Sequence, residues 1–393
     1  MMLKKTNKIL LFSPSFYGGG AERVLSQLYN HDPNTYECAC FKHNNKDNTY
    51  LSCDPPKSNC LESISDANKL SVSGLKRKNI KSFFKLKFPN SSKRIDSLIK
   101  IILRISFLHS LLSRYGSIIV CDYSTVYLLL VAVFFSHHNP LIIFRPSIDL
   151  DYINKIFFSN NILQKLLNGF GLYLLRSYKN KRYVFQTLKI KYSFEVNTLL
   201  SNSDGYLLLN NPLSQDRAFP QHTAMYSGNM LLNFTYIGRA TYDKGFDRYT
   251  AMSQNNNLSN HKFHYYGPSS IDTWENNNIL DHGWSDPSNI SYQNHILIIP
   301  SRVEGYPNIL VEALSSGILV FCSNDVYNLL ELYAQHLLPY INILDDFYDI
   351  NDRFFYDSIR RRTGPSLEKQ IQVIKNLHCL QYYSDSVKRI SLS

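Results

Sequence analysis

The stretch that decides the fold is Ile298-Ile299-Pro300-Ser301-Arg302-Val303-Glu304-Gly305-Tyr306-Pro307-Asn308-Ile309-Leu310-Val311-Glu312-Ala313-Leu314-Ser315-Ser316-Gly317. After an apolar strand, a helix runs from Pro307, which is preset for a first helical turn, to Gly317, which suits the C-terminal cap. The free backbone N–H groups of the first turn, Asn308–Leu310, form an anion site. Glu304 precedes the helix and Glu312 lies within it, so both carboxylates can face one ligand and accept hydrogen bonds from sugar hydroxyls.

A second string follows another strand in the same half of the chain: Tyr236-Ile237-Gly238-Arg239-Ala240-Thr241-Tyr242-Asp243-Lys244-Gly245-Phe246. Arg239 and Lys244 stand five residues apart across a tight loop, and Gly238 and Gly245 allow close backbone approach or a positive φ. Two cations at the mouth of a sheet suit a diphosphate, because Arg offers a forked donor and Lys a point charge. Together with the first string, this loop predicts a site for a diphosphate ligand.

A third string, Gly18-Gly19-Gly20, stands between the apolar run 9–12 and a helical stretch. It can cradle phosphate or leave room for a ligand. It is not a dinucleotide fingerprint, because Arg23 stands where G-x-G-x-x-G needs its last glycine. A P-loop is also excluded, since no Gly-Lys-Ser/Thr follows.

Strand-type runs recur along the chain and alternate with helical stretches. The runs lie at 9–12, 117–121, 141–144, 206–209, 234–237, 262–266, 295–299 and 318–321. This alternation predicts parallel sheets with right-handed crossovers. We expect an α/β protein of two Rossmann-like domains whose sheets face each other across an interdomain cleft, with ligands at the carboxyl ends of the strands. A turn-rich segment at 201–205 places the boundary between residues 205 and 206.

Composition excludes several classes of protein. The chain has 393 residues and a formal charge of +11, which favours an anionic partner. Its seven cysteines are odd in number and contain no C-x-x-C pair, so we expect reduced thiols rather than a zinc or disulfide framework. The apolar run 9–12 is too short for a signal peptide, and the longest apolar run, 127–135, is too short to span a bilayer.

The three strings together resemble the retaining nucleotide-sugar glycosyltransferases of the GT-B fold, family 4 (group 1). Glu304 and Glu312 stand in that family's E-x7-E motif, the stretch 238–245 is similar to its donor-phosphate motif, and Asn211-Pro212 is similar to its usual start of the second domain. The resemblance implies an N-terminal acceptor-binding domain (1–205), a C-terminal donor-binding domain (206–365), and a final helix (about 366–393) that packs back on the first domain.

The resemblance also implies residue roles. Arg239 and Lys244 would bind the donor diphosphate and stabilise it as leaving group, Glu304 would contact the transferred sugar, and these three are the expected catalytic residues. Glu312 would contact the ribose, and the loop His282-Gly283-Trp284 would lie near the nucleobase. The full expected donor site comprises Gly19, Gly20, Gly238, Arg239, Lys244, Gly283, Glu304, Gly305, Tyr306, Asn308, Ile309, Leu310 and Glu312.

The acceptor side departs from the family pattern. Many members carry a His after the strand that corresponds to 141–144, whereas this chain has Arg145-Pro146-Ser147-Ile148-Asp149. Arg145 or Asp149 can face the acceptor, and Arg145 as a buried structural cation is an equal alternative. Asp149 and Asp151 spell D-x-D, a pattern that could hold Mg or Mn. We favour a capping or turn pair, because Arg239 and Lys244 already supply the positive charge, and we expect no metal and no other cofactor.

Residues 75–104 carry ten basic side chains against one acid, Asp96, with Phe83, Phe84, Leu86 and Phe88 among them. A solvated helix face and a nucleic-acid surface are the alternatives. The interleaved aromatic residues favour an anionic membrane surface, and no nucleic-acid module accompanies the stretch.

The sequence therefore predicts an enzyme of the hexosyl- or glycosyltransferase type (EC 2.4). It would move a sugar from a UDP- or GDP-sugar to a lipid-linked glycan in the synthesis of a cell-surface polysaccharide such as lipopolysaccharide, O-antigen or capsule. It would work in the cytoplasm, at the inner face of the membrane. A non-catalytic glycan- or membrane-binding relative of the same fold and an NAD-linked nucleotide-sugar-modifying enzyme are the alternatives.

Overall fold

The structure, a computed structural model, describes residues 6–16, 20–42, 59–61, 71–72, 75–76, 92–147, 150, 162–201, 203–213, 231–267, 278–285, 290, 295–360 and 365–392. The chain forms two compact units. The first comprises Met1–Gln186, Ile190–Leu209 and Ser384–Ser393, and the second comprises Thr187–Lys189 and Asn210–Tyr383.

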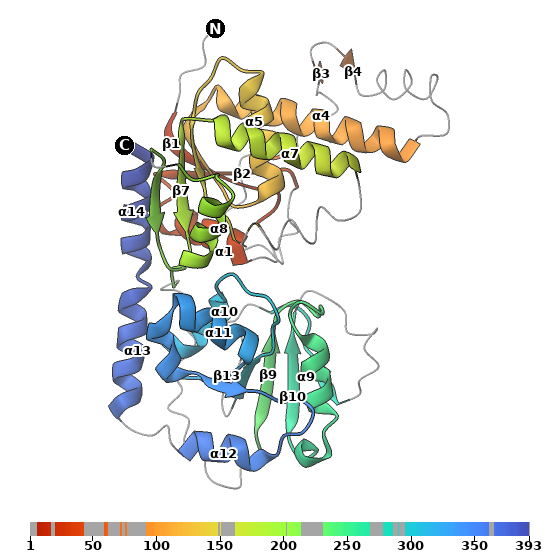
Figure 1. Cartoon of the computed structure of the whole chain (residues 1–393), viewed down its shortest axis with the longest axis vertical. Helices are drawn as coiled ribbons and strands as arrows, with labels where there is room; N and C mark the ends of the chain where they lie inside the picture. Colours follow the sequence, from red (N-terminus) through yellow and green to blue (C-terminus); the bar gives the residue numbers. More distant parts are fainter. Residues whose placement is uncertain are drawn as a thin grey trace. The chain divides into compact units, whose positions relative to one another are not determined.

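The first unit is built on a six-stranded sheet in which every neighbouring pair of strands is parallel (Figure 1). The strand order is β2-β1-β5-β6-β7-β8. The bounds are β1 Thr6–Ser13, β2 Tyr36–Cys40, β5 Tyr115–Val120, β6 Leu141–Phe144, β7 Lys181–Phe185 and β8 Gly205–Leu208. A separate antiparallel pair consists of β3 (Ser71–Val72) and β4 (Leu75–Lys76).

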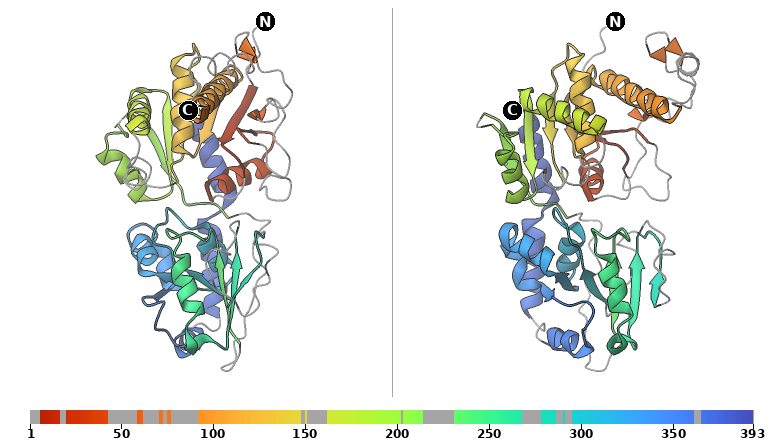
Figure 2. Two further views of the ribbon diagram at one scale, coloured as in Figure 1. Left: turned by 90° about the vertical axis from the view of Figure 1, so that its right-hand side faces the viewer. Right: turned by 45° about the vertical axis from the view of Figure 1, so that its right-hand side comes forward.

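Helices α4, α5 and α7 run side by side over one face of this sheet (Figure 2). Their apolar side chains pack with alternate strand residues such as Leu10 and Phe12, as the period of two along a strand requires. Asp122 caps α5, where its carboxylate accepts a 2.8 Å hydrogen bond from the Thr125 N–H. The helices of this unit are α1 Gly20–His31, α4 Ser92–Leu112, α5 Tyr123–Phe134, α7 Ile162–Ser177 and α8 Leu188–Val196.

The second unit contains another six-stranded parallel sheet, in the order β11-β10-β9-β12-β13-β14. Its central strands are buried on both faces, which explains their continuous apolar sequences. The bounds are β9 Asn233–Ile237, β10 Lys262–Tyr266, β11 Ile279–Asp281, β12 His295–Ile299, β13 Leu319–Ser323 and β14 Asn342–Leu344.

Helices cover both faces of the second sheet. Side chains from α9 and α12 contribute to the core on one face, and side chains from α10, α11 and α13 contribute to the core on the other. Figure 1 shows these helices around the sheet. The helices are α9 Phe246–Ser253, η4 Asn256–Leu258, α10 Asn308–Ser315, α11 Asn324–Tyr333, η7 Gln335–Tyr340, α12 Asp352–Arg360 and α13 Pro365–Leu377. The prediction of an α/β protein with two parallel sheets is confirmed.

The end of the chain divides between the units. Helix α13 packs against α10 in the second unit. In α14 (Leu380–Leu392), the residues from Ser384 onward belong to the first unit, where the Lys388 ammonium lies 2.8 Å from the Asp32 carboxylate. The hydrogen bond from Lys388 lowers the pKa of Asp32 to about 2. The described cysteines are all free thiols: Cys38, Cys40, Cys60, Cys121, Cys322 and Cys379.

Candidate functional site

The loop between β9 and α9 is shaped by two glycines. Gly238 has φ 150°, and its N–H donates to the Tyr266 carbonyl at 3.0 Å. Gly245 has φ 70° and caps α9, and a Cβ at this position would lie 2.0 Å from the Pro300 carbonyl oxygen. The loop therefore needs glycine at 245, both for its left-handed backbone and because the next loop of the sheet comes close to it.

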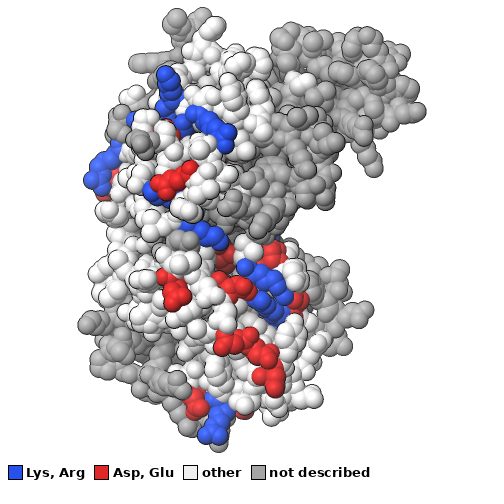
Figure 3. Space-filling model, in the orientation of Figure 1, with Lys and Arg blue, Asp and Glu red and all other residues white. Residues whose placement is uncertain are grey.

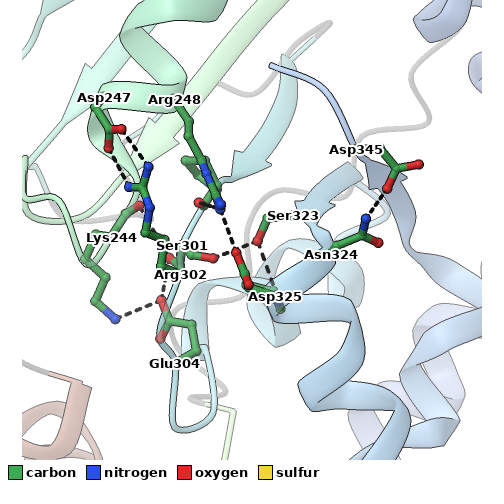
Figure 4. Close-up of polar contacts among 12 residues, drawn as sticks. Lys244, Asp247, Arg248, Ser301, Arg302, Glu304, Ser323, Asn324, Asp325 and Asp345 are labelled. Atoms are coloured by element: carbon green, nitrogen blue, oxygen red, sulfur yellow. Dashed lines mark hydrogen bonds and ion pairs between the residues drawn. The ribbon is translucent and has the colours of Figure 1, made fainter. Parts of the chain in front are cut away.

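Lys244 and Glu304 meet at the carboxyl edge of the second sheet (Figure 4). The Lys244 ammonium lies 2.8 Å from Glu304 Oε1, and the same oxygen accepts a 2.8 Å hydrogen bond from the Ser301 hydroxyl. The Ser323 hydroxyl in turn donates to the Ser301 carbonyl at 2.6 Å. The Lys244 side chain keeps 25% of its exposure and that of Glu304 keeps 13%, so the pair is largely buried but part of the Lys244 surface stays open to a ligand.

Arg239 lies on the same loop in a different setting. Its guanidinium is 3.6 Å from the Asp243 carboxylate, and its side chain is 55% exposed. The Arg239 carbonyl accepts a 2.6 Å hydrogen bond from the Tyr236 hydroxyl. Burial raises the pKa of Tyr236 well above its ordinary value, so this phenol stays protonated and holds the loop backbone.

Arg302 joins the two loops, a role that sequence reasoning missed. Its guanidinium makes a forked pair with Asp247 at 2.6 and 2.7 Å (Figure 4). It also donates to the Tyr242 carbonyl at 2.7 Å and lies over the Tyr242 ring, 3.8 Å from the ring centroid. The backbone N–H groups of Arg302 and Val303 also donate to the Asp243 carbonyl, at 2.9 and 3.2 Å. Burial acts to raise the pKa of Asp247, but the Arg302 hydrogen bonds outweigh it and the pKa lies below its ordinary value.

The helix of the E-x7-E string begins one residue later than predicted. Pro307, with φ −73° and ψ 106°, is the N-cap of α10 and not part of its first turn, because its ψ is extended. It makes no side-chain cap, and the Leu310 N–H donates to its carbonyl at 3.1 Å. Glu312 lies within α10 with 4% of its surface exposed. Gly317, with φ 78°, ends the helix as expected.

The loop expected near the nucleobase is anchored by stacked rings. The Tyr266 and His282 rings stack with centroids 4.4 Å apart, and His264 Nδ1 lies 2.9 Å from His282 Nε2. Gly283, with φ 65°, follows directly, and its carbonyl accepts from the Gly267 N–H at 2.9 Å. Burial lowers the pKa of His264 to about 4, so this ring is neutral near pH 7.

On the face of the second unit in Figure 3, basic and acidic side chains lie beside one another.

The acceptor-side candidates are less completely placed. Arg145 follows β6 and is 1% exposed, with its guanidinium 3.9 Å from the Cys121 sulfur. Asp149 and Asp151 lie outside the described residues. Of the N-terminal glycine string, which was predicted for the donor side, Gly20 begins α1, and Gly18 and Gly19 lie outside the described residues. Of the basic stretch, 77–91 also lies outside them.

Two broader observations concern metals and membranes. Within the described ranges, no group of three or more His, Cys, Asp or Glu side chains is arranged as a metal site. Of the helices that the structure describes, none has the length and apolar character needed to cross a membrane.

Comparison with solved structures identifies the fold. The sucrose-phosphate synthase of Thermosynechococcus elongatus matches with a TM-score of 0.64 at 11% identity, over 98% of each chain. HepE of Anabaena in complex with UDP and glucose matches with a TM-score of 0.61 at 11% identity, over 99% of this chain and 100% of that chain. The chain has the GT-B fold. WaaG, a glycosyltransferase involved in lipopolysaccharide biosynthesis, shares the fold with a TM-score of 0.53 at 10% identity, over 96% of this chain and 98% of its own.

The similarities found by comparing sequences are more limited than those found by comparing structures. No protein-family model matches the chain. A stretch of 126 residues is 29% identical to an uncharacterized 41.2 kDa protein in the cps region of Klebsiella pneumoniae. That match covers 30% of this chain and 34% of the other protein, so it spans about a third of each.

Proposed function

We propose that this protein is a glycosyltransferase that takes its sugar from a nucleotide-sugar donor. The observation that carries the proposal is the Lys244–Glu304 pair, 2.8 Å apart at the carboxyl edge of a GT-B sheet and next to the N-terminal turn of α10. Ligands of parallel α/β sheets bind at this edge. HepE, which shares the fold, was solved with UDP-glucose, and this supports a nucleotide sugar as the donor.

In the proposed reaction, Lys244 and Arg239 bind the donor diphosphate, and Glu304 accepts hydrogen bonds from the sugar. In the free protein, the Lys244 ammonium is paired with Glu304. When the donor binds, its diphosphate becomes a further partner of that ammonium. The bond from the anomeric carbon to the diphosphate oxygen breaks, and the acceptor oxygen bonds to that carbon on the same face, so configuration is retained. The departing phosphate takes the acceptor proton, while the two cations stabilise the charge that develops on it. This scheme needs no metal.

We propose the remaining donor contacts from the resemblance to the family. Glu312 would hold the ribose, the first turn of α10 would face phosphate or sugar oxygens, and the loop at Gly283 would lie by the base. Arg145 is nearly fully buried, so we propose that it supports the acceptor side as a structural cation.

We further propose that the acceptor is a lipid-linked glycan of a cell-surface polysaccharide. The similarity to a protein of a cps region and the shared fold of WaaG support this pathway. The enzyme would act as a peripheral protein at the inner face of the cell membrane, through residues 75–104.

The donor proposal is tested by thermal shift with a panel of UDP-, GDP- and ADP-sugars. A ligand at 100 times its dissociation constant stabilises the fold by about 2.7 kcal/mol. The matched pair of variants is Lys244→Ala, which should lose the shift, and Lys262→Ala, an exposed lysine at the start of β10, which should keep it. If no nucleotide sugar stabilises the wild-type protein, the proposed function is wrong.

The membrane proposal is tested by sedimentation with liposomes. Each Lys or Arg near an anionic surface contributes about 1 kcal/mol, so binding should require anionic lipid and be released by high salt. A variant with six residues changed to Ser should stay in solution but keep its donor affinity; the six are Lys76, Arg77, Lys78, Lys81, Lys85 and Lys87. Sedimentation of this variant at the wild-type level would contradict a role for the basic stretch.

A further inference from the structure

The loop that precedes α10 is tied to one buried asparagine. Asn211 is 4% exposed, and its side-chain amide donates to the Tyr306 carbonyl at 3.3 Å and to Asn308 Oδ1. Tyr306 and Asn308 flank the N-cap of α10, so Asn211 fixes the backbone on both sides of the helix start. Asn211 lies at the start of 210–383, the long segment of the second unit.

A buried histidine from the other end of that segment completes the contacts. His378 is 1% exposed, and its Nδ1 lies 2.7 Å from the Asn211 carbonyl oxygen. A carbonyl only accepts hydrogen bonds, so the ring proton is on Nδ1. Nε2 therefore carries the lone pair and accepts a 3.3 Å hydrogen bond from the Tyr306 hydroxyl.

The same histidine joins the beginning and the end of the segment through its backbone. The His378 carbonyl accepts a 2.8 Å hydrogen bond from the Leu213 N–H, and Leu213 and Cys379 form an isolated parallel bridge. Residues 211–213 thus lie beside 378–379, shortly after the segment begins and shortly before it ends at Tyr383. The His378 side chain, itself near the end of the segment, therefore contacts both Asn211 near its beginning and Tyr306 in the loop that runs from Glu304 to Asn308.

We infer that His378, acting through Asn211 and the Tyr306 hydroxyl, is a positioning residue that couples occupancy of the 304–308 loop to the two connecting segments 209–213 and 376–383. This inference rests on the proposed function, because the ligand that occupies the loop is the donor nucleotide. A nucleotide that orders the loop strengthens the bonds from Tyr306 and Asn211, and these hold the connecting segments. Coupling of this kind is reciprocal, so loosening the segments weakens nucleotide binding by the same factor.

Three variants separate positioning from a general structural role. His378→Asn places an amide where Nδ1 stands and keeps a donor for the Asn211 carbonyl, but it loses the acceptor for Tyr306. Tyr306→Phe removes only the hydroxyl and keeps the ring in its place. His295→Asn is the matched control, because His295 is a buried histidine of the same unit, 7% exposed, whose Nδ1 lies 2.6 Å from the Thr235 hydroxyl.

The measurement is amide hydrogen exchange of the full chain with and without saturating UDP, with GDP in parallel. In the wild type and in His295→Asn, the nucleotide should slow exchange in 304–312 and also in 209–213 and 376–383. In His378→Asn and Tyr306→Phe, protection of 304–312 should remain while protection of the connecting segments is lost. The nucleotide dissociation constant of these two variants should rise about three- to tenfold, as expected for one hydrogen bond.

The outcomes are distinguishable. Protection of the connecting segments that is equal in all four proteins would overturn the role of His378. Protection confined to 304–312 in the wild type would overturn the coupling while leaving the donor site intact. If neither nucleotide protects 304–312 in the wild type, the proposed function fails and the coupling fails with it. Faster exchange throughout β9 and β12 in Tyr306→Phe would assign the hydroxyl a general structural role and also overturn the inference.

Discussion

Two lysine–carboxylate pairs, one chosen from each unit, illustrate different uses of the same chemistry. In the first unit, Lys181 lies 3.2 Å from Asp204, both side chains are about 95% buried, and the ammonium also donates to the Tyr178 carbonyl at 2.8 Å. In the second unit, Lys244 lies 2.8 Å from Glu304, with 25% and 13% of the side chains exposed. The first ammonium is enclosed by protein acceptors, whereas the second remains reachable by a ligand.

The comparison teaches that burial separates a structural ion pair from a binding one. A buried pair must be complete, because removal of one partner leaves a charge without compensation in a region of low dielectric. A partly exposed pair can exchange its partner for a ligand, since water reaches the charges while the exchange takes place. Five expected outcomes test or sharpen this distinction.

The largest effect should come from the buried pair. Lys181→Met leaves the Asp204 carboxylate without its cation, and the free energy of unfolding should fall by about 3–5 kcal/mol. Urea unfolding measures the loss, and turnover per folded molecule should be unchanged. The double variant Lys181→Met/Asp204→Leu should recover much of the stability; no recovery would mean that the pair is not the cause.

Removal of the two cations beside the predicted diphosphate site should instead affect turnover more than stability. Lys244→Ala and Arg239→Ala should each lower kcat at saturating donor by on the order of 10²–10³-fold, because each removes a preorganised cation from the leaving diphosphate. Their unfolding free energies should fall by less than that of Lys181→Met, because both cations are more exposed than Lys181. Turnover near the wild-type value would exclude a leaving-group role.

A buried histidine should make the second unit sensitive to acid. Burial lowers the pKa of His378 to about 4, from 6.5 in the unfolded chain, despite the opposing hydrogen bond to Asn211. The neutral ring favours folding, so this stability is complete above about pH 6.5 and is lost as the pH falls toward 4. Between pH 7 and pH 5 the contribution should fall by about 2 kcal/mol. Unfolding of His378→Asn at both pH values should show a correspondingly smaller pH dependence.

Two glycines with similar backbones should differ in their tolerance of a side chain. Gly245 and Gly283 have φ 70° and 65°, so alanine at either position costs about 1–2 kcal/mol for the left-handed conformation. At 245 the new Cβ would also meet the Pro300 carbonyl oxygen at 2.0 Å, whereas nothing lies within 4 Å at 283. Gly245→Ala should therefore be the less stable variant by at least about 1 kcal/mol in thermal unfolding.

The smallest expected effect is that of chelation. If Lys244, Arg239 and the α10 terminus neutralise the diphosphate, turnover in excess EDTA should equal turnover without it. Full inhibition by EDTA that Mn or Mg restores would favour a role for Asp149 and Asp151 and would count against Lys244 and Arg239 as the main source of positive charge.

Much of the fold could be predicted from short-range patterns. The apolar run 141–144 is a strand of those bounds, and the runs at 234–237 and 262–266 are neighbouring strands β9 and β10. The run 141–144 is recognisable because both of its faces are buried, so every residue is apolar. The other two runs are recognisable by their aromatic and β-branched residues. That Lys244 and Glu304 lie at the same edge of the sheet could also be predicted, since the loops that follow parallel strands gather there.

Other features depend on residues that are far apart in the chain. The E-x7-E string does not reveal that Arg302 joins Asp247, or that His378 meets Asn211 across a separation of 167 residues. Nor does a lysine in the sequence reveal whether it is enclosed, as Lys181 is, or reachable, as Lys244 is.

The sequence by itself determined the alternation of strands and helices, the glycine positions of the loop between β9 and α9 and the residue types of the candidate site. Those features arise from backbone sterics and local periodicity, which act within a few residues. Only the tertiary structure decided which charges are buried, which tautomer His378 holds and which loops are tied together. These depend on solvent exclusion and on hydrogen-bond partners that packing brings from distant parts of the chain, and the free energy of a charge or a ring nitrogen changes with that environment.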